Sequence, residues 1–174
     1  QEMMFEMRYG ASRPADNVGL DKVETKIINR EKYELAKSNG GLRFNVGCGH
    51  IPLPKYLNVD RRELPDVDIV ADVFDLPAVE GEVSEIFSSH LLEHFPQEQL
   101  SRELLPYWIS LLSPGGTFRA VVPDAQAMLT KYIEDDYPYE KLRQVTYGAQ
   151  DYDGDFHFNM FTPESLKTLL RDFG

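Results

Sequence analysis

Two histidines and a glutamate stand close together in the segment His90-Leu91-Leu92-Glu93-His94. This H-x-x-E-H spacing is that of inverted zinc peptidases, in which both histidines bind zinc from one helical face and the glutamate activates water. That arrangement needs a stable helix, whereas His90 follows a β-branched and aromatic run and Pro96 comes two residues after His94. A third ligand would have to come from elsewhere, with His157 or a distant acid as the candidates. We therefore expect no metal site, and expect Glu93 and His94 to begin a helix and to pack.

Two glycines at the end of a predicted strand form a second candidate site, in Asn45-Val46-Gly47-Cys48-Gly49. Glycines there let the chain turn tightly and let its backbone approach a ligand. The next predicted strand ends in Asp60, whose carboxylate could accept both hydroxyl protons of a ribose, and the third ends in Asp72. Two acids beside a glycine turn fit an adenosine better than a pyrophosphate, whose charge they would repel. We expect Cys48 to be a small packing residue and not a nucleophile.

Five short apolar, β-branched runs predict the parallel strands that position these residues. The runs are residues 42–46, 56–59, 67–71, 83–87 and 117–122. Between the last two, apolar residues at helical spacing predict a helix that Pro106 kinks or restarts and that ends at the Ser113-Pro114-Gly115-Gly116 turn. Between Gly49 and Tyr56, two prolines disfavour a crossover helix, so we expect a loop or a single turn.

The flanking segments have different patterns. Residues 20–37 have apolar side chains at helical spacing and predict a leading amphipathic helix. Residues 133–161 are rich in tyrosine, phenylalanine and aspartate without clean periodicity, and predict an inserted lid or loop. A last helix is expected to begin at the capping residue Thr162 and to run to Gly174. The alternation of strands and helices predicts an α/β doubly wound fold, whose ligands lie outside the carboxyl ends of the strands.

Composition narrows the function further. The chain has 174 residues, of which 29 are acidic and 18 basic, giving a net charge of −11. This length predicts one main domain over residues 42–174, preceded by an N-terminal segment, 1–41. The acidic balance should repel phosphates, so no nucleic-acid partner is expected. The start of the chain, QEMMFEMRYG, lacks a signal-peptide pattern and no apolar run is long enough to predict a membrane span, while a single cysteine, Cys48, favours a cytoplasmic location.

Six blocks, taken in order from Leu42 to Gly174, resemble the class I S-adenosylmethionine-dependent methyltransferases. They are most similar to a bacterial branch of predicted methyltransferases associated with cell-surface polysaccharide synthesis. The resemblance implies a Rossmann-like sheet with helices on both faces, with S-adenosylmethionine as cofactor and S-adenosylhomocysteine as product. These enzymes continue into a final antiparallel strand pair, so we expect either a fragment or an exposed sheet edge covered by another subunit, as in a homodimer. The blocks are NVGCGH, LNVD, VADVFDLP, SSHLLEHF, LLSPGGTFRAVVPD and HFNMFTPESLKTLLRDFG.

The resemblance also implies a cofactor site at the ends of the first four predicted strands. Asn45 and Arg61 belong to the expected cofactor-binding set. Its other members are Gly47, Cys48 and Gly49 under the methionine moiety, Asp60 on the ribose, Asp72 with Val73 around the adenine, and Ser89 with His90 lining the methyl-donor pocket.

Methyl transfer to a hydroxyl needs a base to remove its proton, but no metal. The candidate bases are His90 at a strand end, His157 in the expected lid, and Asp124 after the fifth strand; a structural His157 is the alternative. Between Tyr132 and Phe161, five tyrosines and three phenylalanines interleave with aspartates. These rings could stack on sugar faces, or simply pack the lid onto the sheet. We expect a small-molecule or saccharide acceptor, methylated at oxygen.

Three other functions share parts of this pattern. A nicotinamide-dependent dehydrogenase also uses a glycine turn and an acid, but Pro52 stands where the third glycine of G-x-G-x-x-G belongs. A non-catalytic S-adenosylmethionine-binding protein would keep the same motifs. The third alternative is a zinc hydrolase built on H-x-x-E-H.

Overall fold

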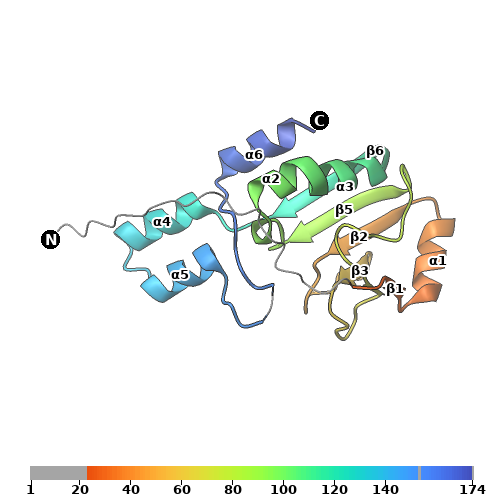
Figure 1. The fold of residues 1–174 in the computed structure, drawn as a ribbon, viewed down its shortest axis with the longest axis horizontal. Helices are drawn as coiled ribbons and strands as arrows, with labels where there is room; N and C mark the ends of the chain where they lie inside the picture. The colour runs from red at the N-terminus through yellow and green to blue at the C-terminus, as the bar shows by residue number, and fades with distance from the viewer. Residues whose placement is uncertain (1–22, 153, 174) are drawn as a thin grey trace, which may run out of the picture.

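The computed structural model describes residues 23–152 and 154–173. Their strands form one six-stranded sheet in the order β1-β4-β3-β2-β5-β6 (Figure 1). Neighbouring strands are parallel except β1 and β4, which pair antiparallel. The predicted α/β class with a mainly parallel sheet is therefore confirmed. The strands are β1 (Lys26–Ile27), β2 (Leu42–Val46), β3 (Leu57–Asp60), β4 (Ile69–Val70), β5 (Val83–Ser89) and β6 (Leu112–Val121).

All five strands predicted from the sequence are present. Four of the five residues of β2, and all four of β3, are buried, as expected for parallel strands covered on both faces. The strand β6 begins earlier than predicted, because the expected turn at 113–116 is a bulge within it. Val83 pairs with Leu112 and Glu85 with Thr117, so the intervening residues of β6 loop out of register.

The described helices follow the strands or connect them. The segment η1 is a 3-10 helix and η2 is a π-helical turn. No helix is present between β2 and β3, which confirms the predicted loop. The helical segments are α1 (Arg30–Ser38), η1 (Leu92–His94), α2 (Gln97–Gln99), η2 (Leu100–Leu104), α3 (Leu105–Leu111), α4 (Ala125–Glu134), α5 (Tyr139–Tyr147) and α6 (Pro163–Arg171).

The predicted leading helix over residues 20–37 is wrong at its start. Of its residues, 20–22 lie outside the described part of the chain, and 23–29 are not helical. The physical reason is a partner distant in sequence: Lys26 and Ile27 pair with β4. Asn29 then caps α1, because its side chain accepts a hydrogen bond from the Lys32 amide.

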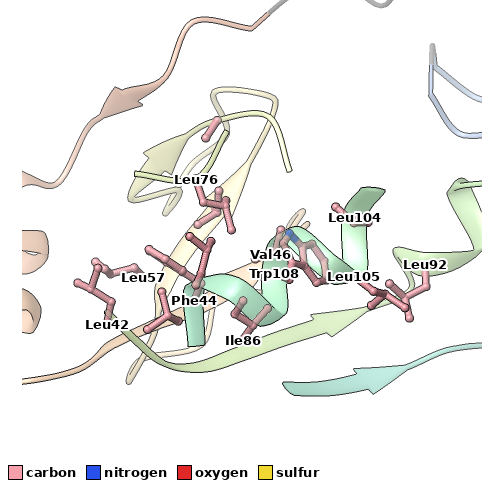
Figure 2. Close-up of a cluster of buried hydrophobic side chains, with 14 of the residues drawn as sticks. Leu42, Phe44, Val46, Leu57, Leu76, Ile86, Leu92, Leu104, Leu105 and Trp108 are labelled. Carbon is pink, nitrogen blue, oxygen red and sulfur yellow. The ribbon is translucent and has the colours of Figure 1, made fainter. Parts of the chain in front are cut away.

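The crossover between β5 and β6 is helical from α2 through α3. The π-helical turn η2 ends at Leu104, two residues before Pro106, so the helix changes its hydrogen bonding next to the proline at which the sequence predicts a kink or a restart. The apolar side of the crossover packs into the core, where Leu104, Leu105 and Trp108 lie with side chains of β2 and β5 (Figure 2). The Trp108 indole also donates a hydrogen bond to the Val73 carbonyl at 2.9 Å.

Residues 133–161, expected to be an inserted lid or loop, are not a plain loop, because α4 extends into them and α5 lies within them. The half-buried side chains of 142–146 stabilise α5, and the many aromatic residues hid this helix in the sequence. Both helices lie beyond the carboxyl ends of β5 and β6 (Figure 1). After α5 the described chain runs back to the end of β6 without a further helix, and Phe161 pairs there with Asp124 in a single parallel bridge. The last helix, α6, begins at its Thr162 cap as predicted but ends at Arg171.

Candidate functional site

The glycine turn lies at the carboxyl end of β2. Gly47 and Gly49 both have a left-handed backbone, with φ of +69° and +51°. A Cβ at Gly47 would lie 2.8 Å from Leu91 Cδ1, so the Leu91 side chain covers this glycine. The Cys48 amide donates to the Val59 carbonyl at 3.0 Å and joins the turn to β3. Both the conformation and the close contact therefore require glycine at position 47.

Asp60, the last residue of β3, connects the turn to its neighbours. Its carboxylate accepts hydrogen bonds from the Gly49 amide at 2.9 Å and from the Arg62 amide and Nε at 3.0 and 3.1 Å. The Arg62 guanidinium lies over the Tyr152 ring, 4.4 Å from its centroid. Arg62 and Tyr152 therefore cover Asp60, and this residue is only 6% exposed. A ligand hydroxyl that donates to Asp60 Oδ1 would compete with Arg62 for this oxygen.

Asn45 lies in the interior and supports the loop after the turn. Its amide donates to the Ile51 carbonyl at 3.2 Å and to Asn58 Oδ1 at 3.0 Å. Arg61 follows Asp60 and lies near Gly154: a Cβ on that glycine would be 3.8 Å from Arg61 Nη1. Asn45 therefore supports the turn from the interior, and Arg61 lies beside the segment that follows α5.

Asp72 and Val73 form the exit from β4. Asp60 pairs with Val70 in neighbouring strands, so Asp72 follows at the same edge of the sheet. Asp72 Oδ1 accepts from the Phe74 amide at 3.0 Å, and both Asp72 and Val73 are half-buried. The two acids that the sequence predicts at one sheet edge are brought there.

Cys48 is buried beside Val67 and Val70. Burial, together with the nearby charges of Asp60 and Asp68, raises the pKa of the thiol to about 12. The thiol is protonated at neutral pH and is no nucleophile, in agreement with the packing role predicted from the sequence.

Ser89 and His90 end β5 on the other side of β2. The His90 amide donates to the Val121 carbonyl at 2.9 Å, and its backbone is left-handed, with φ of +53°. This turn leaves the imidazole 63% exposed, with Nδ1 3.5 Å from Glu93 Oε1. His90 is therefore accessible at the carboxyl end of the sheet, while Ser89 is half-buried.

A second cluster of titratable groups lies directly after His90. Glu93 is 1% exposed, and neither of its carboxylate oxygens has a hydrogen-bond partner. Burial raises the pKa of Glu93 to about 7, and burial together with His157 lowers the pKa of His94. The rings of His94 and His157 meet edge to face, with centroids 4.8 Å apart.

The expected lid carries His157 into this cluster. The Glu93 carbonyl accepts hydrogen bonds from the amides of Phe158 at 2.8 Å and Asn159 at 3.1 Å. The His94 ring Nδ1 lies 3.1 Å from the Phe156 carbonyl. These bonds attach residues 156–159 to η1. This attachment could not be predicted from the sequence. The only signal for the cluster was the H-x-x-E-H pattern with His157 as a candidate third ligand.

Asp124, the third candidate base, caps α4. Its Oδ1 accepts from the amides of Gln126 at 3.0 Å and Ala127 at 3.1 Å. Helix capping therefore accounts for this aspartate without a catalytic role.

From the last residue of α5 onward, some aromatic residues pack in the core and others are exposed. Phe161 is buried and packs in the core, which fits the packing alternative for that ring. Tyr147, Tyr152, Phe156 and Phe158 are exposed and present ring surface to solvent.

A separate cleft of about 810 Å³ lies between α1 and the loop at 52–54. Its buried carboxylate, Asp68, accepts hydrogen bonds from Lys32 Nζ at 2.6 Å, the Asn58 amide at 2.8 Å and Asn29 Nδ2 at 3.0 Å. These contacts give Asp68 a structural role in holding α1 against the sheet.

No protein-family model and no curated protein matches this chain. In the described residues, no helix has both the length and the apolar surface needed to cross a membrane. Two contributors to the site, Arg62 and Leu91, were not identified from the sequence. The signals were weak: Arg62 is half of the dense basic pair with Arg61, and Leu91 stands inside the H-x-x-E-H segment.

Proposed function

We propose that this protein is an S-adenosylmethionine-dependent methyltransferase with a Rossmann-like, doubly wound sheet. In this proposal it acts in the cytoplasm and methylates an oxygen of a small-molecule or saccharide acceptor. The observation that carries the proposal is the hydrogen bond from the Gly49 amide to Asp60, which joins a left-handed glycine turn to an acid on the neighbouring strand.

The position of this pair in the sheet supports a nucleoside ligand. Strands β3 and β4 follow β2 to one side, whereas β5 and β6 lie on its other side. In open α/β sheets, ligands bind outside the carboxyl ends where the strand order reverses in this way. The glycine turn and His90 flank that point.

The charges favour adenosine over a dinucleotide. Asp60 and Asp72 suit a ribose diol and an uncharged base but would repel a pyrophosphate. In the described chain no helix follows the glycine turn before β3, so no helix N-terminus is available there for a phosphate. Both features disfavour the dehydrogenase alternative.

The acceptor side is argued from accessibility. Methyl transfer forms a bond from the acceptor oxygen to the methyl carbon as the carbon–sulfur bond breaks, and its electron pair stays on sulfur in S-adenosylhomocysteine. The acceptor proton passes to a base, and the exposed His90 ring at the end of β5 is our first candidate, because the free nitrogen of a neutral imidazole accepts a proton. Exposed rings such as Tyr152 and Phe156 offer stacking surface for a saccharide.

Calorimetric titration of the EDTA-treated protein with S-adenosylhomocysteine tests the donor half. We expect micromolar binding, about −8 kcal/mol, and none of NADH. Asp60→Asn should weaken binding at least about tenfold, because it removes the charged group that is proposed to accept hydrogen bonds from the two ribose hydroxyls. Asp66→Asn, an exposed change on the loop between β3 and β4, is the matched control. No binding by the unmodified protein, or equal binding of NADH, would contradict the proposal.

Transfer of a labelled methyl group to saccharide and small-molecule hydroxyls tests the second half. His90→Ala should abolish turnover and leave S-adenosylhomocysteine binding within about twofold, since a base acts on the acceptor and not on the donor. Binding without turnover of any acceptor would favour the non-catalytic alternative.

A further inference from the structure

The Glu93 carboxylate accepts no hydrogen bond, although it is one of the most buried side chains of the described chain, and the exposed His90 ring lies 3.5 Å from its Oε1. Both oxygens are shielded from solvent and accept no hydrogen bond. Buried charged groups in proteins are normally paired or coordinate a metal ion. Glu93 also borders a cavity of about 10 Å³ lined by Ala125, Met128 and Thr146, which leaves room for about one water molecule.

Two imidazoles lie beside this carboxylate, and a main-chain carbonyl holds one nitrogen of each ring. Nδ1 of His94 lies 3.1 Å from the Phe156 carbonyl, and Nδ1 of His157 lies 2.7 Å from the Val145 carbonyl. A carbonyl oxygen can only accept, so in the neutral form each ring carries its proton on Nδ1 and leaves the Nε2 lone pair for a metal ion. Metal-binding histidines are held in this way, by donating the other ring N–H to a carbonyl or carboxylate.

We propose that Glu93, His94 and His157 bind one divalent transition-metal ion, of which zinc fits best. One potential ligand atom from each side chain lies within 4.8 Å of the other two. Zinc bonds of about 2.0–2.2 Å place tetrahedral ligand atoms about 3.5 Å apart, so the side chains need to close by only about 1 Å. Two imidazoles and a carboxylate match zinc and its neighbours in the first transition row, whereas magnesium and calcium require mostly oxygen ligands.

This site is not the H-x-x-E-H site that we rejected from the sequence. The earlier objection was that His90 and His94 could not share a stable helix, and the 63% exposed His90 ring is not one of these ligands. The third ligand comes instead from the segment that returns after α5. A bound ion would join η1 to that segment and leave one coordination position for water. The proposal does not depend on methyl transfer.

Titration of the EDTA-stripped, dialysed full chain with zinc chloride tests the site. We expect one ion per chain, and a fall in affinity of at least about 100-fold in His94→Ala and in His157→Ala, because loss of even an outer partner of a ligand costs roughly 10–100-fold. His50→Ala is the matched control, since His50 is exposed and outside the cluster. Zinc should also raise the melting temperature of the unmodified protein, and cobalt should give visible d–d bands.

Three results would overturn the proposal: no zinc binding by the stripped protein, unchanged affinity in both histidine variants, or equal affinity for magnesium chloride. If a variant unfolds, ring resonances of the unmodified protein decide instead. Zinc must shift those of His94 and His157 and leave those of His50 unchanged, and any other pattern refutes the site. Titrating the metal-free protein with S-adenosylhomocysteine keeps this question separate from the proposed function, because either ligand can bind without the other.

Discussion

Replacing Gly47 with alanine should destabilise the protein by two separable effects. The first is conformational: the left-handed backbone, with φ of +69°, costs an L residue about 1–2 kcal/mol. The second is steric: the new Cβ would lie 2.8 Å from Leu91 Cδ1 and 3.0 Å from Cδ2. Forced repacking costs about 1–3 kcal/mol, and the lower end applies because Leu91 is a half-buried, adjustable side chain. We expect the free energy of unfolding to fall by about 2–4 kcal/mol.

Urea denaturation followed by circular dichroism measures this loss, and Gly40→Ala provides the matched control. Gly40 has a φ of +83°, but a Cβ there meets nothing within 4 Å. It should therefore show the conformational cost alone, about 1–2 kcal/mol. Adding Leu91→Ala to Gly47→Ala should remove the steric part from the double variant. Equal losses in Gly47→Ala and Gly40→Ala would refute the close approach of Leu91 to the glycine turn.

Three further predictions follow from individual contacts. Arg62→Met should raise S-adenosylhomocysteine affinity by up to about fivefold in calorimetry, because it removes an ion pair worth about 1 kcal/mol that competes for Asp60. A loss of affinity would show instead that the arginine binds the ligand. The pKa of the Cys48 thiol is raised from 9.0 to about 12, so the thiol should resist alkylation at pH 8. The free energy of unfolding should also decline as the pH rises from 9 toward 12, because the thiol ionises at lower pH in the unfolded protein than in the folded one. In Cys48→Ala this decline should be smaller. In Gly148→Ala the new Cβ would lie 2.2 Å from the Asp155 carbonyl oxygen, so limited proteolysis after α5 should accelerate about tenfold or more. A loss of about 1.4 kcal/mol in local stability is enough for this acceleration. In Gly154→Ala, where a Cβ meets only Arg61 Nη1 at 3.8 Å, the rate of proteolysis should change less.

The strands could be predicted because their signal is local and strong. In the run at 42–46 the apolar residues Leu42, Phe44 and Val46 alternate with polar ones, and it becomes β2 with the predicted bounds. The segment at 23–29 misled the prediction, because its helical spacing is outweighed by pairing of Lys26 and Ile27 with β4, a partner distant in sequence. The helix α5 was missed because none of its residues is fully buried, so it has no clear apolar stripe, and tyrosines stand at both of its ends.

The candidate site, like the fold, could be predicted from the sequence only in part. The meeting of the glycine turn with Asp60 could be predicted, because carboxyl ends of parallel strands share one edge of the sheet. The cover over Asp60 could not, because it depends on where the chain returns after α5 and brings Tyr152 onto Arg62. The same return decides that His157 meets His94, and it is fixed by main-chain hydrogen bonds to Glu93 that leave no pattern in the sequence.

The central claim is that the ends of β2, β3, β4 and β5 form a nucleoside site. Titrating ¹⁵N-labelled protein with S-adenosylhomocysteine, and mapping amide shifts by residue, tests it most directly. We predict that the largest shifts gather at residues 47–49, 60–62, 72–74 and 89–91. No shifts at saturating ligand, or shifts centred on the cleft between α1 and the loop at 52–54, would contradict the claim.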